Sequence, residues 1–144
     1  MLLSECINFI LTRAQNCVFT HFKNKLDPFD VTPAQYAVLK CLWDHGDQSP
    51  TQLSQLLFLD TSTITGIISR MENKKLIKRL NSKIDRRAVT IRIKPLGKKL
   101  QPQIEQAIAE ANAEVLDTFT EDELVLFKQY IAKIINSVES IENS

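Results

Sequence analysis

The chain has 144 residues, of which 44% are hydrophobic and 24% charged, as in one globular domain, and this composition excludes a mainly disordered protein. Its three glycines and five prolines favour a helical fold over a turn-rich sandwich or barrel. No apolar run approaches the ~20 residues of a membrane span, and residues 1–10 lack the basic start and cleavage site of a signal peptide. We therefore expect a cytoplasmic protein with no membrane partner.

The net charge of +1 hides an uneven distribution. Residues 70–99 hold twelve of the eighteen basic residues and two acids, Glu72 and Asp85, so this segment carries +10 and the rest −9. One concentrated basic stretch in a near-neutral protein is typical of a polyanion binder. A charged surface that binds nothing is the alternative.

Helical spacing and capping residues predict the first helices. Apolar residues recur at steps of three and four over residues 2–25, and Asp27-Pro28 ends that helix. Three further starts combine a capping hydroxyl with glutamine or glutamate three residues later: Thr32, Ser49 and Thr120. They predict helices over residues 33–44, 50–58 and 121–141, the last burying Leu124, Phe127, Ile131, Ile134, Ile135 and Val138.

A further helix and a hairpin are predicted between these elements. Residues 61–75 have an apolar stripe of Ile64, Ile67, Ile68 and Met71, and Asp60 or Thr61 caps this helix. The period then changes to two at Val89–Ile93, which predicts a strand that pairs with residues 77–80. Pro95 restarts a helix, and Pro102 kinks it or delays its start.

The order helix, short turn, helix and basic hairpin predicts a winged helix-turn-helix. Small polar side chains let the helix over residues 61–75 approach base edges and phosphates in the major groove, whereas a merely solvated face is usually rich in Glu and Lys. The predicted contacts on this helix are Ser62, Thr63, Thr65, Gly66, Ser69, Arg70 and Asn73.

The hairpin adds a second predicted contact. Arg86 and Arg87 at its tip suit a minor groove, and Asp85 orients one of these arginines, although an ordinary surface ion pair is the alternative. The predicted phosphate contacts are Lys74, Lys75, Lys78, Arg79, Lys83 and Arg92.

These motifs resemble the MarR family of bacterial winged-helix regulators over essentially the whole chain. The resemblance is carried by residues 57–66, 70–72, 76–77 and 85–87 with the strand that follows. It implies that Arg87 is the wing arginine that enters the minor groove, that Asp85 is its partner, and that the first and last helices interlock in a homodimer. Lys94-Pro95 departs from the family pattern, in which many members have a threonine cap after the wing.

We therefore expect a mainly α-helical single domain, 1–144, with a winged helix-turn-helix over 32–99. Its wing is a two-stranded β-hairpin, and N- and C-terminal helices form a dimerisation region over 2–31 and 100–144. The predicted function is a dimeric repressor that binds a pseudo-palindromic operator in double-stranded DNA and responds to a small molecule.

Two other function classes stay open. The first is a thiol redox sensor using Cys6, Cys17 or Cys41, although buried cysteines usually act as small hydrophobes. The second is a winged-helix adaptor that binds acidic protein. We expect no enzyme, cofactor or metal, because the sequence has no catalytic motif or metal-ligand spacing around His21 and His45.

Overall fold

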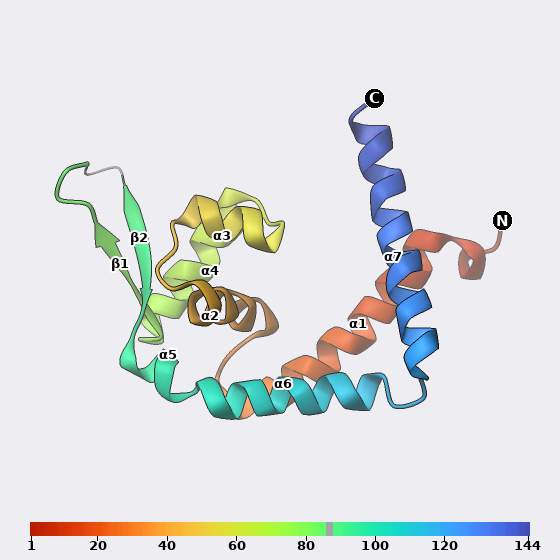
Figure 1. Cartoon of the computed structure of the whole chain (residues 1–144), viewed down its shortest axis with the longest axis horizontal. Helices are drawn as coiled ribbons and strands as arrows, with labels where there is room; N and C mark the ends of the chain where they lie inside the picture. The colour runs from red at the N-terminus through yellow and green to blue at the C-terminus, as the bar shows by residue number, and fades with distance from the viewer. Residues whose placement is uncertain (86–87) are drawn as a thin grey trace. The chain divides into compact units, whose positions relative to one another are not determined.

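The computed structural model describes residues 1–85 and 88–144 and is mainly helical with one antiparallel hairpin, as predicted (Figure 1). It has two compact units, residues 1–111 and 112–144. No helix among the described residues combines the length and apolar character needed to cross a membrane. The elements in chain order are η1 (Leu3–Glu5), α1 (Ile7–Leu26), η2 (Asp27–Phe29), α2 (Pro33–His45), α3 (Pro50–Leu57), α4 (Thr61–Asn73), β1 (Ile77–Asn81), β2 (Val89–Ile93), α5 (Pro95–Lys99), α6 (Gln101–Val115) and α7 (Glu121–Glu142).

Capping side chains begin the helices where the sequence places them. The Thr32 hydroxyl accepts from the Gln35 N–H at 3.1 Å, and the Gln35 side chain accepts from the Thr32 N–H at 3.2 Å. The same reciprocal arrangement begins α3 at Ser49 and α7 at Thr120. Of the two candidate caps for α4, the structure uses Asp60, whose carboxylate accepts from the Thr63 N–H at 2.7 Å. Each cap satisfies backbone donors that the first helical turn leaves unpaired.

The core of residues 1–111 lies among α2, α3, α4 and the hairpin, which Figure 1 shows grouped together. The predicted stripe of α4 is buried, and it packs with Leu39 of α2 and Leu53 of α3. Burying these side chains stabilises the fold by roughly 1.5–3 kcal/mol each. One face of α4 is therefore committed to the core and the opposite face is left to solvent.

The hairpin is tied to the helices at its base. Strands β1 and β2 pair from Ile77 opposite Ile93 to Asn81 opposite Val89. The connection between α2 and α3 adds a further pairing, in which Gln48 and Ile91 exchange backbone hydrogen bonds of 3.2 and 2.7 Å. This pairing fixes the direction of the hairpin relative to α3 and α4.

Three helix boundaries differ from the sequence prediction by more than one residue. The helix expected from residue 2 begins at Ile7, because the backbone at Cys6 is extended. Helix α4 ends at Asn73 rather than at residue 75, where Lys75 has a left-handed φ of 62°. The helix restarted by Pro95 breaks at Leu100, so that Pro102 lies in the first turn of α6, where proline is tolerated.

The prediction that α7 buries its apolar residues is wrong for the single chain. No residue of α7 is buried, and Phe127, Ile135 and Val138 are about half exposed. The helix has the predicted apolar periodicity, and its apolar residues stay at least partly exposed in the described chain.

We expect Gly97→Ala to lower the free energy of unfolding by about 2 kcal/mol, because overpacking a close contact forces the neighbours to move. A Cβ at Gly97 would lie 2.7 Å from both the Ile93 Cγ1 and the Leu76 carbonyl oxygen. Gly66→Ala is the matched control, since its Cβ would make an ordinary 3.5 Å contact with Arg70. Urea unfolding measures both variants, and equal stability of the two would contradict this packing.

Candidate nucleic-acid interface

The exposed face of α4 carries the polar residues singled out in the sequence. Burial of the apolar stripe on one side of this helix turns the small polar side chains to the other side. Gly66 and Ser69 are half-buried, and the exposed members are Ser62, Thr63, Thr65, Arg70 and Asn73. The predicted set therefore forms one accessible surface along α4.

Two hydroxyls on this surface are held by local hydrogen bonds. Ser62 donates to the Asp60 carboxylate at 2.7 Å, and Thr65 donates to the Thr61 carbonyl at 2.9 Å. Hydrogen bonds from the Thr63 N–H and then the Ser62 hydroxyl hold the pKa of Asp60 below its ordinary value. The first turn of α4 thus presents hydroxyl oxygens in fixed directions, with lone pairs available as acceptors.

Arg70 lies over Gly66, one turn earlier on the same helix. The position of a Cβ on Gly66 would be 3.5 Å from Arg70 Nη2, so the guanidinium covers the glycine. The absent side chain leaves room for the guanidinium to lie against the helix backbone at this point. Arg70 is the longest donor on this face and presents its guanidinium there.

Arg79 of β1 connects the hairpin to α4. Its guanidinium forms an ion pair with Glu72 and donates to the Ser69 hydroxyl at 3.1 Å. Its backbone N–H also donates to the Glu72 carboxylate, at 3.3 Å. The predicted phosphate contact at Arg79 is thus a residue that braces the two elements, and it orients the predicted contact Ser69.

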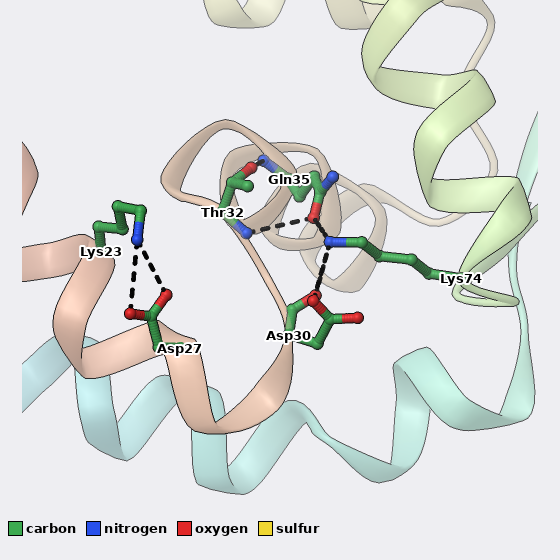
Figure 2. Close-up of polar contacts among 6 residues, drawn as sticks. All are labelled: Lys23, Asp27, Asp30, Thr32, Gln35 and Lys74. Carbon is green, nitrogen blue, oxygen red and sulfur yellow. Dashed lines mark hydrogen bonds and ion pairs between the residues drawn. The ribbon is translucent and has the colours of Figure 1, made fainter.

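Lys74 reaches from the end of α4 to the corner between α1 and α2 (Figure 2). Its Nζ donates to the Asp30 carbonyl at 2.8 Å and to the Gln35 side-chain oxygen at 2.9 Å, and it lies 3.4 Å from the Asp30 carboxylate. Gln35 is only 3% exposed and also forms the cap of α2. Lys74 therefore joins α4 to the buried start of α2.

Arg92 of β2 forms an ion pair with Asp47, the residue directly before Gln48. Its Nε and Nη2 donate to one carboxylate oxygen at 3.0 and 2.7 Å. The hydrogen bond from Arg92 is the main cause that lowers the pKa of Asp47. Arg92, like Lys74 and Arg79, forms an ion pair with an acidic residue of the chain. The other predicted phosphate contacts, Lys75, Lys78 and Lys83, have exposed side chains.

The tip of the hairpin is closed by a short turn around Ser82. The Ser82 hydroxyl accepts from the N–H groups of Ile84 and Asp85, both at 3.2 Å, and the Ser82 N–H donates to the Ala88 carbonyl at 3.0 Å. Lys83 and Asp85 are exposed there. The predictions for Arg86 and Arg87, and for the arginine that Asp85 orients, concern residues outside those described.

The three cysteines lie in different environments. Cys41 is buried, and burial followed by the charge of Asp44 raises the pKa of its thiol, which disfavours the reactive thiolate. Cys17 is exposed and Cys6 half-buried, so the expectation of buried, inert cysteines holds for Cys41 alone. Within residues 1–85 and 88–144, no cluster of three His, Cys, Asp or Glu side chains could hold a metal ion.

Comparison with known proteins relates this fold to one family. Residues 31–89 match the model of the MarR family. The chain is 29% identical over 141 residues to the HTH-type transcriptional regulator MgrA of Staphylococcus aureus, with 95% of this chain and 92% of that protein covered.

Two solved structures share the fold. A mutant of MarR from E. coli, complexed with operator DNA, has a TM-score of 0.83 at 23% identity and covers 93% of this chain and 98% of its own. BpsR of Bordetella bronchiseptica, whose DNA binding is regulated by 6-hydroxynicotinic acid, has a TM-score of 0.84 at 24% identity, with 93% and 96% covered. Over most of its length the chain is thus similar to winged helix-turn-helix transcriptional regulators, and residues 31–89 match the MarR family.

Proposed function

We propose that this chain is a homodimeric repressor that reads a pseudo-palindromic operator with α4 and the β1–β2 hairpin. The observation that carries the proposal is the exposed polar face of α4 with Arg70 and Asn73, which adjoins the most basic segment of the chain. Helix α4 would lie in the major groove and the hairpin in the flanking minor groove. The exposed lysines Lys75, Lys78 and Lys83 would contact phosphates.

The proposed dimer rests on the uncovered apolar residues of α1 and α7. Ile7, Phe9 and Ile10 of α1 are exposed, and α7 has no buried residue although it is 22 residues long. Exposed apolar surface of this extent marks an interaction site. We assign residues 2–31 and 100–144 to the dimerisation region and residues 32–99 to DNA binding. Because a two-fold dimer reads two half-sites on one face of the DNA, the half-site centres would lie about 34–36 Å apart or a multiple of that.

We also propose that a small molecule controls this binding, as the regulation of the structurally similar BpsR by 6-hydroxynicotinic acid supports. A cavity of about 440 Å³ lies between the start of α2 and the end of α4, and Gln35, Arg70 and Lys74 line it. A molecule bound there would contact Arg70 and compete with its role at the operator. Release of the protein from DNA by small aromatic acids tests this; no release by any of them would contradict it.

The experiment that tests the proposed function is selection of genomic DNA fragments by the purified protein, with affinities then measured at several salt concentrations. We expect a palindromic site bound at least 10³-fold more tightly than random DNA, with a steep salt dependence. Equal weak binding to all fragments would contradict a sequence-specific reader. Binding to acidic protein instead of DNA would support an adaptor.

We expect Lys74→Met to weaken operator binding without changing the slope of log affinity against log salt. Because its ammonium is held by Asp30 and Gln35, Lys74 would position α4 and release no counterions from DNA. Lys75→Met is the control on an exposed neighbour, and it should lower the slope by about 0.9 for each phosphate that is no longer neutralised. An equal decrease of slope in both variants would contradict this and would show that Lys74 contacts a phosphate.

A further inference from the structure

Phe58 is the most conspicuous apolar side chain of the helix-turn-helix. It follows the last residue of α3, two residues before the Asp60 cap of α4, and it is 90% exposed. Its neighbour Leu59 packs against the core instead. The turn therefore presents an aromatic ring to solvent immediately before the polar face of α4 begins.

The backbone at Phe58 is in the left-handed region, with φ 55° and ψ 40°. Helices that stop in this way usually have Gly or Asn at that position, because a side chain with a Cβ is strained there. Ser54 holds the conformation: its carbonyl accepts from the N–H groups of Phe58 and Leu59, and its hydroxyl donates to the Leu59 carbonyl. The fold thus maintains a strained residue whose side chain makes little contact with the core.

Strain and exposure together point to a role outside the folded chain. Packing in the core does not explain the presence of an aromatic residue that is 90% exposed. Asn or Gly would adopt the backbone conformation of this turn with less strain. Non-glycine residues held in rare backbone conformations cluster at ligand-binding sites, where the contact offsets the strain. The location of Phe58 identifies the ligand surface that it can meet.

We propose that Phe58 contacts the apolar surface of the operator, either a thymine methyl group or the adjoining deoxyribose. This inference rests on the proposed function. In a helix-turn-helix the first helix crosses the DNA backbone and the N-terminal residues of the second contact base edges. The turn between them, which contains Phe58, lies between the backbone and those edges. Phenylalanine is suited to this place because thymine offers the major groove a methyl group.

The hairpin tip has a related feature that agrees with this assignment. Ile84 is 100% exposed and lies beside Lys83 and Asp85 in the segment proposed to meet the minor groove. The turn before α4 and the hairpin therefore each present an almost fully exposed apolar side chain. Such contacts add affinity that does not depend on salt, beside the ionic contacts of the lysines.

The experiment compares Phe58→Asn with Phe58→Tyr in the full chain. We expect Phe58→Asn to raise Tm by about 3 °C, because Asn accepts the left-handed backbone with less strain. The same variant should bind the selected operator about tenfold more weakly at every salt concentration, with an unchanged salt slope. Phe58→Tyr keeps the ring and the strain, and should keep both the wild-type Tm and the wild-type affinity.

Operator DNA with uracil in place of individual thymines separates the two contact surfaces. If Phe58 meets a thymine methyl group, one such replacement weakens wild-type binding and leaves Phe58→Asn unaffected. If Phe58 meets deoxyribose, Phe58→Asn binds more weakly than the wild type, and the difference in affinity between the two is the same on every uracil-substituted operator. Unchanged affinity of Phe58→Asn would overturn the inference, whereas failure of the wild type to select an operator would instead overturn the proposed function.

Discussion

Arg70→Ala is expected to weaken binding to the selected operator by about 100-fold and to relax its sequence preference. A bidentate contact from arginine to a base contributes roughly 1–3 kcal/mol, and the substitution removes it from both half-sites of a dimer. Arg70 is exposed on the same face of α4 as Gly66, and its guanidinium covers that glycine. Fluorescence anisotropy with operator and random duplexes measures both the affinity and the preference.

Lys99→Ala is the control for this effect, because it removes one exposed positive charge from α5, outside the proposed interface. It should change operator affinity by less than about twofold, since one distant charge is largely screened at physiological salt. Both variants should keep the wild-type Tm. A similar decrease in affinity for Arg70→Ala and Lys99→Ala would show that only net charge matters, which is incompatible with direct base reading by α4.

Ile135→Asp is expected to convert the dimer to a monomer and to reduce operator affinity by at least about 100-fold, because one half-site then binds alone. Ile135 is 50% exposed on α7, a helix with no buried residue. An isolated carboxylate placed in an apolar interface costs several kcal/mol. Analytical ultracentrifugation at micromolar concentration measures the mass, and the anisotropy assay measures the affinity.

Lys133→Asp supplies the matched control on the same helix. Lys133 lies two residues, or about 200°, from Ile135 and so on the opposite, polar side of α7 together with Gln129 and Ser137. This variant should remain dimeric and keep its operator affinity. A monomeric Lys133→Asp with a dimeric Ile135→Asp would place the interface on the other side of α7.

The elements of the fold are predictable because their signals are local. The reciprocal caps at Thr32, Ser49 and Thr120 each involve residues three positions apart, and the structure shows all three. The stripe of α4 and the period-two strand Val89–Ile93 are likewise contained within single elements. Such patterns depend only on helix and strand geometry, so they survive into the folded chain.

The role of the basic residues is less predictable because their partners are distant in sequence. Lys74 meets Asp30 across 44 positions and Arg92 meets Asp47 across 45, so charge alone could not separate them from exposed lysines. Arg79 is closer to Glu72, but their contact depends on how β1 folds back against α4. Sequence therefore identifies a basic segment, and tertiary structure decides which cations remain available to DNA.

Phe58 and α7 show two other limits. No role is predicted from the sequence for Phe58, which is exposed in the structure. The signal that could have found it is the absence of Gly or Asn at the residue that ends α3. The apolar period of α7 correctly predicts a helix, but periodicity does not say whether the covering surface comes from the same chain or from a second copy.

Hydroxyl-radical footprinting of the wild-type protein on its selected operator tests the central claim most directly. The account predicts two symmetry-related protected half-sites, with centres about 10 base pairs apart or a multiple of that, each with a flanking minor-groove contact. Arg70→Ala should remove protection from both half-sites together. A single protected site without symmetry, or protection unchanged by Arg70→Ala, would contradict a dimer that reads DNA with α4.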